Sequence, residues 1–224
     1  MKYNKLIILL YISLCFYSIE SKNLIEDGPL KIIALTTKEV ASDGGSIYTL
    51  EHHNLNCGIG VLTQFNLKKL GPYKCQFEYK CVQPSACNKN CENFLKKQDG
   101  KKCKSESTKP ESVEKNDKKS VMSLKSHKID CGKGRLLTQI AAKSRKNLNK
   151  LYYNYTCCQM KVGACKVETL AWKSYAQDMS INIMDGYKVG NQAPLSNGIQ
   201  TIKLEVDAKK KSFRYEITTC IIIG

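Results

Sequence analysis

The sequence predicts a mostly β, antiparallel fold that is stapled by disulfides and assembled from internal repeats. Three observations support this prediction: apolar and polar residues alternate along several segments, a cysteine-glycine motif occurs twice, and 12 of the 224 residues are cysteines. Alternation with a period of two turns one side of a strand toward a core. Glycines next to the first cysteine of each motif permit a tight bend or a bulge.

Two segments share the same order of motifs. The first begins with Cys57-Gly-x-Gly60 and continues into Leu62-Thr-Gln64. The second begins with Cys131-Gly-x-Gly134 and continues into Leu137-Thr-Gln139. Similarity at a fixed order of positions indicates an internal repeat.

Each of these segments closes with an aromatic alternation that ends in cysteine. The closing segments are Phe77–Cys81 and Tyr153–Cys157. A disulfide from the bend to the end of the aromatic strand would clamp a hairpin that is marginal alone. We therefore expect the pairs Cys57–Cys81 and Cys131–Cys157. We interpret 136–151 as a strand, a long basic loop and a strand, although its apolar spacing also suits a helix.

A third, candidate repeat lies at 185–224 and lacks the first cysteine. A strand at 199–206 is followed by a charged turn at 207–212 and by an aromatic strand that runs from Phe213 to Cys220. The layout repeats although the residues diverge, so we expect a final buried strand at the C-terminus.

The N-terminus indicates export. A short basic start precedes an apolar run over 6–17, which is too short to span a bilayer and has the length of a signal-peptide core. We expect a signal peptide at 1–21 and a secreted or extracellular product, with passage through a secretory organelle as one route. The alternative is an N-terminal membrane anchor.

Composition then divides the rest of the chain. We expect a first cysteine-rich β module at 22–95, a charged flexible linker at 96–121 and a second cysteine-rich β module at 122–224. The middle segment is dominated by Lys, Glu, Ser, Asp and Asn, which cannot bury a core. We expect 104–120 to be disordered, with Cys103 tethering the linker to the first module.

Removal of Cys15 with the signal peptide leaves an odd number of cysteines in an oxidising compartment. We expect the spare thiol in the C-terminal half, at Cys157, Cys158 or Cys165, with Cys158 otherwise reaching Cys165 or Cys220. Two alternatives stay open: an exposed thiol that links chains into a disulfide-bonded homo-oligomer, or a buried and inert one. The disulfide candidates are Cys57, Cys75, Cys81, Cys87, Cys91, Cys103, Cys131, Cys157, Cys158, Cys165 and Cys220.

The formal net charge of +16 favours anionic partners. Because export makes nucleic acid an unsuitable target, the predicted partners are an extracellular matrix protein or an acidic glycan or lipid surface. The alternative is a lysine-rich surface that serves only solubility. Loops at the same end of repeated hairpins would form a cationic rim from Lys143, Arg145, Lys146, Lys150, Lys209, Lys210 and Lys211.

Residue types and motifs that catalysis requires are scarce in this sequence. The chain has three histidines and no Gly-x-Ser-x-Gly motif, and a cysteine held in a disulfide is no nucleophile. We therefore predict no catalytic residue, metal site or cofactor. The triplet Asn154-Tyr-Thr156 is an N-glycosylation sequon, and Asn154 faces solvent if its tyrosine neighbours face inward. We expect the single tryptophan, Trp172, in the core.

The Cys-Gly-x-Gly motif with its aromatic closing strand resembles the modules of secreted three-fold β-prism proteins. Examples are the vitelline-membrane outer-layer protein and the C-terminal domain of apicomplexan perforin-like proteins. The resemblance implies a β-prism or sandwich-like fold. In layout, the two cysteine modules around a charged segment are similar to the Plasmodium secreted ookinete adhesive protein. That similarity implies storage in micronemes, disulfide-linked complexes and adhesion to basement-membrane laminin.

These features predict a secreted, cysteine-rich adhesion protein. The alternatives are a secreted toxin or effector that acts on membranes or channels, and a hydrolase or inhibitor module.

Overall fold

Long antiparallel hairpins form the centre of each of three sheets. The computed structural model describes residues 30–42, 45–84, 103–112, 121–125, 127–145, 149–175, 180–190 and 196–223. The predicted signal peptide lies outside these residues. The hairpins are β4 (Val61–Lys69) with β5 (Lys74–Pro84), β9 (Arg135–Arg145) with β10 (Lys150–Gln159), and β14 (Asn197–Asp207) with β15 (Ser212–Ile222). The mostly β, antiparallel fold with internal repeats is confirmed, and the candidate third repeat forms a sheet of its own.

An outer strand pairs with the second strand of each hairpin and is interrupted once. These outer strands are β1 (Leu30–Thr36) with β2 (Val40–Ala41), β6 (Cys103–Ser107) with β7 (Glu111–Ser112), and β11 (Val162–Thr169) with β12 (Lys173–Ser174). The prediction of a flexible linker is therefore wrong for residues 103–112. Backbone pairing to β10 and a disulfide order this segment although it has no apolar face.

The basic loop in the second hairpin is also shorter than predicted. Because β9 continues to Arg145 and β10 begins at Lys150, only 146–149 connect the two strands. The expected strand character of this stretch is confirmed, and the helical alternative is excluded.

A short crossing strand from each repeat completes the sheet of another repeat. β3 (Asn54–Asn56) pairs with β9, β8 (Lys128–Asp130) with β14, and β13 (Val189–Gly190) with β4. A 3₁₀ helix precedes each crossing strand: η2 (Ile47–His52), η3 (Val121–Leu124) and η5 (Ile181–Met184). The exchange runs from the first repeat to the second, to the third and back, so the three sheets close a ring.

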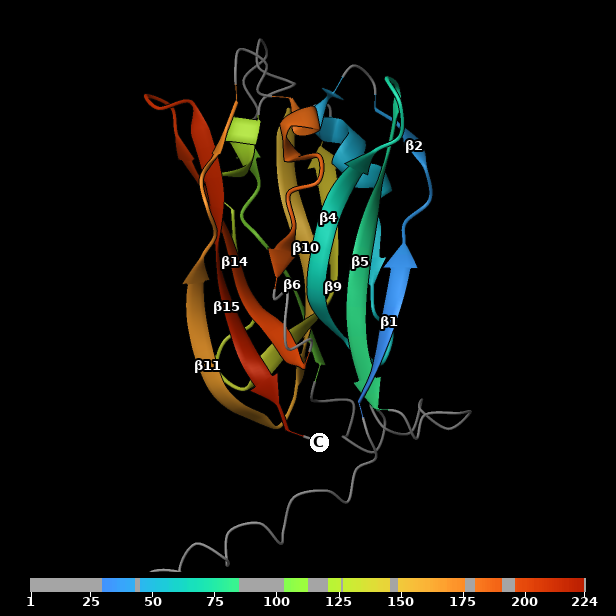
Figure 1. The fold of residues 1–224 in the computed structure, drawn as a ribbon, viewed down its shortest axis with the longest axis vertical. Coiled ribbons are helices and arrows are strands. Elements are labelled where there is room, and N and C mark those ends of the chain that lie inside the picture. The colour runs from blue at the N-terminus through green and yellow to red at the C-terminus, as the bar shows by residue number, and fades with distance from the viewer. Residues whose placement is uncertain are drawn as a thin grey trace, which may run out of the picture.

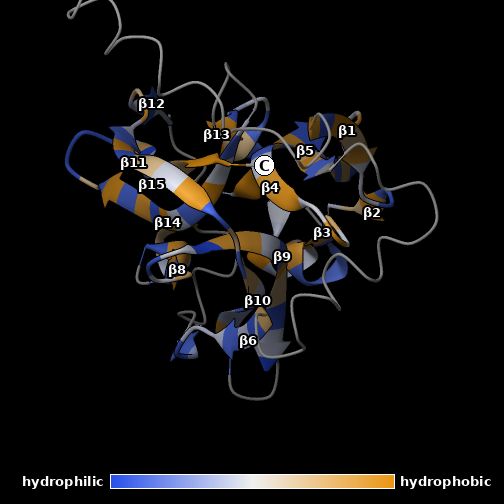
Figure 2. Cartoon of the chain, turned by 90° about the horizontal axis from the view of Figure 1, so that it is seen from below, coloured by the Kyte–Doolittle hydropathy of each residue, from blue (hydrophilic) through white to orange (hydrophobic). Residues whose placement is uncertain are grey.

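We name the sheets A, B and C after the hairpins β4–β5, β9–β10 and β14–β15. Figure 2 looks along the long axis and shows the three sheets around one centre, like the faces of a prism. One side chain at the same register position of each hairpin lies in that centre, fully buried or nearly so: Leu62, Leu137 and Ile199. Alternation along the strands thus builds one apolar core that all three repeats share.

A β-bulge lies at the same place in the first strand of every hairpin. The register shifts at Thr63 in sheet A, at Thr138 in sheet B and at Gln200 in sheet C. Thr63 and Thr138 each donate a hydroxyl hydrogen bond to a carbonyl of the facing strand. Bulges increase the local twist of a strand, which suits sheets that curve around a common axis.

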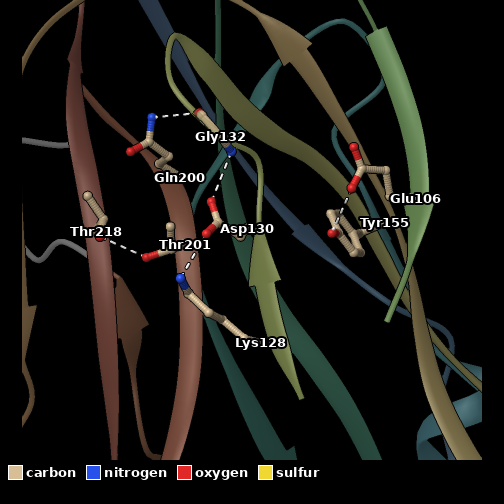
Figure 3. A network of polar contacts seen from close by, with 8 residues as sticks. All are labelled: Glu106, Lys128, Asp130, Gly132, Tyr155, Gln200, Thr201 and Thr218. Carbon is tan, nitrogen blue, oxygen red and sulfur yellow. Dashed lines mark hydrogen bonds and ion pairs between the residues drawn. The ribbon is translucent and has the colours of Figure 1, made fainter. Parts of the chain in front are cut away.

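The crossing strands are anchored by small polar turns. In the first repeat the Gly58 N–H donates to Asn56 Oδ1 at 2.8 Å, and in the second the Gly132 N–H donates to Asp130 Oδ1 at 2.9 Å. Both glycines have positive φ, at 58° and 70°, which glycine adopts without strain. Figure 3 shows that Asp130 contacts Gly132 and Lys128, and that Gly132 in turn contacts the third repeat, since Gln200 Nε2 donates to the Gly132 carbonyl.

Two kinds of disulfide staple the prism. Cys57–Cys81 and Cys131–Cys157 tie the end of a crossing strand to its own hairpin, as predicted. Cys103–Cys158 and Cys165–Cys220 tie an outer strand to the hairpin beside it. The predicted partner of Cys103 in the first module and the predicted partners of Cys158 are therefore wrong.

The vicinal pair Cys157-Cys158 belongs to the one repeat that carries both kinds of staple. Successive residues of a strand point to opposite faces, so each of these two sulfurs reaches a different partner. All three cysteines expected to hold the spare thiol are paired. Among the cysteines of the described segments, Cys75 is the free one, and it is buried. Cys87 and Cys91 lie outside the described residues.

Candidate functional site

The three hairpin turns lie at one end of the prism. In Figure 1 the turns of β4–β5, β9–β10 and β14–β15 are at the top, and the C-terminus is at the bottom. This arrangement follows from the repeat, because each hairpin leaves the shared core in the same direction. Side chains far apart in the sequence therefore gather at one end of the molecule.

The structure places the predicted basic residues at these turns. Lys143 and Arg145 end β9 and Lys150 begins β10, while Lys209, Lys210 and Lys211 form the turn between β14 and β15. Lys146 lies outside the described residues. The third turn is tight because Asp207 Oδ1 accepts a hydrogen bond from the Lys210 N–H at 3.0 Å, which leaves all three lysines exposed.

The first repeat adds lysines that the sequence analysis missed. Lys69 and Lys74 flank the turn between β4 and β5 and are exposed. Comparison of the equivalent hairpin turns in the repeats could have identified these two lysines from the sequence. We call the following set the cationic end: Lys69, Lys74, Lys143, Arg145, Lys150, Lys209, Lys210 and Lys211.

Few acidic groups neutralise the cationic end. Glu39 pairs with Lys74 at 3.3 Å, and Glu51 lies 3.7 Å from His52. Within the described ranges, no carboxylate lies at ion-pair distance from Lys143, Arg145, Lys150 or the lysines of 209–211. These cations are therefore available to an anionic ligand.

The tryptophan lies on the surface, so its predicted place in the core is wrong. Trp172 is 44% exposed on the segment between β11 and β12, and the Arg214 guanidinium stacks over its ring at 4.3 Å. Arg214 also donates to Glu205 Oε2 at 2.8 Å. Arg145 lies 5.7 Å from the ring centre of Tyr152 at the neighbouring turn. Such stacking holds a guanidinium in place beside the cationic end.

The free thiol of the described segments, Cys75, lies next to a histidine. Cys75 Sγ is 3.7 Å from His53 Nε2, and His53 Nδ1 is 2.8 Å from Thr37 Oγ1. Cysteine and histidine at this distance can form a nucleophilic pair. Here burial raises the pKa of the Cys75 thiol and lowers the pKa of His53 to about 4, so both groups are held neutral. A neutral pair that is 1% and 2% exposed has no access to a substrate.

The second repeat contains the same histidine arrangement without the thiol. Thr108 Oγ1 lies 3.0 Å from His127 Nδ1, and burial lowers the pKa of His127. In both repeats the threonine oxygen also accepts the backbone N–H of an aromatic residue, Phe77 or Tyr153. Its hydroxyl proton is then left for the ring nitrogen, so the histidine acts as an acceptor and fixes the outer strand.

The interior of the described segments contains one small cavity between the sheets. An apolar cavity of about 60 Å³ is lined by residues of all three sheets, which is room for no more than about two waters. Across the described segments, no group of three or more His, Cys, Asp or Glu side chains is placed to hold a metal ion. The part of the chain that the structure describes also contains no helix long and apolar enough to cross a membrane.

The sequon residue lies in a groove on the outer side of sheet B. Tyr155 is 7% exposed and faces the core, so Asn154 faces outward as predicted. Asn154 Oδ1 accepts a hydrogen bond from Ser107 Oγ at 2.7 Å. The sequon is thus accessible on a curved polar surface.

Comparison with known proteins gives no relative. No family model matches the chain, and no curated protein or solved structure matches it either. The expected resemblance to secreted β-prism proteins and to the ookinete adhesive protein therefore stays a prediction.

Proposed function

We propose that the chain is a secreted adhesion protein that binds acidic glycans of extracellular surfaces through the cationic end. One observation carries the proposal: lysines and an arginine from three hairpin turns, separated by up to about two thirds of the chain, lie at the same end of one prism. A cluster of exposed cations attracts polyanions and accelerates their association.

The staples support this proposal. Disulfides form and persist in oxidising environments, so four of them in the described segments suit a secreted protein. They also hold the hairpins at fixed positions, so less conformational entropy is lost when several turns contact one extended ligand. Sulfate and carboxylate groups along a glycan chain would contact the three turns together.

Binding to an immobilised sulfated glycosaminoglycan tests the proposal. We expect saturable binding to the sulfated polymer and little to its desulfated form, because the cationic end recognises charge. Since each neutralised anion releases about one counterion, log Kd should rise with log salt concentration with a slope of roughly 3–6. Equal binding to the desulfated polymer, or a slope near zero, would contradict the proposal.

A vesicle assay separates adhesion from the alternative of a membrane-active toxin. Vesicles with 30% anionic lipid, loaded with a quenched dye, are mixed with protein at the concentrations that saturate the glycan. An adhesion protein leaves the vesicles intact, although some protein adsorbs to the anionic surface. Dye release at these concentrations would favour the toxin instead.

A further inference from the structure

The outer side of sheet B forms a polar hollow. It has a volume of about 520 Å³ and is bordered by β3, β9, β10, β6 and the end of η2. We call it the sheet B groove. The outer side of sheet A forms a shallower hollow of about 320 Å³.

The central positions of the sheet B groove carry neutral hydrogen-bonding groups arranged in pairs across the strands. Ser107 Oγ donates to Asn154 Oδ1 at 2.7 Å, and Ser105 Oγ lies 3.0 Å from Thr156 Oγ1. On the other side of the groove Gln139 Nε2 donates to Asn54 Oδ1 at 3.0 Å. Ionisable side chains line its ends: Glu51, His52 and Lys143 lie at the end nearest the hairpin turn. Glu106 lines the β6 side, where its carboxylate accepts from Tyr155 Oη at 3.2 Å and pairs with Lys104 at 2.8 Å.

The other two sheets carry charges at the equivalent positions. Sheet A presents Glu78 at the position of Asn154 and Lys80 at that of Thr156, and Glu78 pairs with Lys68 at 2.7 Å. Sheet C presents Lys203 at 3.1 Å from Glu205, which also binds Arg214. In a protein with 36 lysines and arginines, the neutral face of sheet B stands apart from its two structural counterparts.

One small residue opens the groove. Ala141 faces Asn154 across the hairpin, and the residues at the same register position are Asn66 in sheet A and Lys203 in sheet C. The alanine side chain leaves room above the centre of the sheet, where the other two faces are filled by longer side chains. The fold accepts all three residues at this position.

We infer that the sheet B groove is a saccharide-binding site. Serine and threonine hydroxyls and asparagine and glutamine amides each donate and accept hydrogen bonds, as the hydroxyl and acetamido groups of a sugar do. An apolar ligand would leave these groups unpaired, and an anionic ligand finds more cations at the turns. The inference is independent of the proposed function, because it rests on a different chemistry and its groove shares only Lys143 with the cationic end.

The saccharide has two available sources. One is a free glycan or the glycan of a partner. The other is the chain itself, because Asn154 lies in a sequon and opens directly into the sheet B groove. In the second case the first sugar residues on Asn154 would lie against Ser105, Ser107 and Gln139.

Saturation-transfer NMR on the full disulfide-bonded chain tests the site. Protein made in a host without N-glycosylation is titrated with glucose, galactose, mannose and N-acetylglucosamine, each as the monosaccharide and as a β-linked disaccharide. The variant Ala141→Lys places the residue of sheet C in the groove, and Asn66→Lys makes the matched change in sheet A. We expect at least one sugar to bind, with affinity reduced about tenfold or more in Ala141→Lys and changed less than about twofold in Asn66→Lys.

A second arm identifies the source. Protein secreted from a glycosylating host is examined by peptide mass at Asn154 and by its resistance to an endoglycosidase. A glycan on Asn154 that resists the native enzyme and becomes cleavable in Ala141→Lys supports occupation by the chain's own sugar. Binding of free sugar by unmodified protein supports an external source. If no sugar binds, and Asn154 is unmodified or its glycan is cleaved equally in both variants, the inference is wrong.

Discussion

The third repeat differs from the first two at the point where its outer strand is interrupted. In the first two repeats a threonine and a buried histidine fill this point, as Thr37 with His53 and as Thr108 with His127. In the third repeat Leu170 takes the place of the threonine, since its N–H donates to the Tyr215 carbonyl as that of Thr37 does to Phe77. Tyr187 takes the place of the histidine and packs 5.9 Å from the Tyr215 ring.

The staples differ between repeats in a similar way. Among the described residues, the first repeat has the staple to its crossing strand, the third has the staple to its outer strand, and the second has both. Yet the strand pairing and the bulge are the same in all three. The alternation of apolar and polar residues in the hairpins and the exchange of crossing strands are therefore what define the prism. The two kinds of disulfide, and the buried threonine–histidine or leucine–tyrosine pairs, stabilise it and can replace one another.

Removal of a staple should have the largest effect and would show whether the two kinds are equivalent. The loops closed by Cys131–Cys157 and Cys103–Cys158 span 26 and 55 residues. Chain entropy predicts losses of about 3.5 and about 4 kcal/mol for the respective double serine variants. Urea unfolding of both variants measures these losses. A difference of more than about 2 kcal/mol between them would mean that the two staples are not interchangeable.

Low pH should reduce the free energy of unfolding because the buried histidines of the first two repeats become protonated. The third repeat has no histidine at this point and makes no such contribution. The pKa of His53 is about 4 in the folded chain and 6.5 when unfolded. Stability from the neutral ring is complete above pH 6.5 and is lost as pH falls toward 4, by roughly 2–3 kcal/mol at pH 4.5. His127 acts in the same direction.

Variants isolate this contribution from that of the carboxylates. Unfolding free energies of the wild type, His53→Gln and His52→Gln are compared at pH 7 and pH 4.5. Because Gln does not titrate, His53→Gln should lose roughly 2–3 kcal/mol less than the wild type between the two pH values. The exposed neighbour His52 serves as control: its charge lowers the pKa of His53 less than burial does, so His52→Gln should change the difference much less than His53→Gln. An identical pH dependence in all three proteins would refute the role of the buried ring.

The missing outer staple of the first repeat can be added. Ile32 faces Val82 across β1 and β5 at the register that Cys103 and Cys158 occupy in sheet B. We expect Ile32→Cys with Val82→Cys to form a disulfide and to stabilise the chain by about 2 kcal/mol after the loss of apolar contacts. Thermal unfolding with and without reductant measures the gain. If the oxidised variant is less stable than its reduced form, the repeats are not equivalent at this position.

The smallest effect is expected at Cys75, which corresponds to Leu151 and Phe213 in the other hairpins and serves as an apolar core residue. Since it is 1% exposed and burial raises its pKa, it should resist alkylation in the native protein and react in 6 M guanidinium. Peptide mapping after native and denatured labelling checks this. Rapid native labelling of Cys75 would instead indicate that β5 opens at this point.

The sequence predicts the hairpins well because each has its own period-two pattern, from Leu62 to Cys81 and from Leu137 to Cys157. The outer strand β6 could not be predicted in this way. Its sequence, Cys103-Lys-Ser-Glu-Ser107, has no apolar side and depends on the backbone of β10. The crossing strands are two or three residues long, and their partners lie in another repeat, so local patterns carry no signal for them.

The candidate sites were predicted in part for the same reason. Basic residues at hairpin turns can be found from local sequence, as Lys209, Lys210 and Lys211 were. The sheet B groove combines β3 of one repeat with β6, β9 and β10 of another, and Ala141 matters only through its equivalents in the other sheets. Trp172 was misplaced because a lone aromatic residue carries no information about the arginine that covers it.

The most direct test of the account compares two charge-matched variants. Lys209→Glu, Lys210→Glu and Lys211→Glu reverse one turn of the cationic end, and Lys31→Glu, Lys133→Glu and Lys161→Glu reverse three exposed lysines at the opposite end. Both variants carry a formal net charge of +10, since each substitution removes two charges from +16. Affinity for the sulfated glycosaminoglycan should fall roughly 10- to 100-fold in the first variant and less than about threefold in the second. Equal losses in the two variants would show that total charge, rather than the cationic end, governs binding.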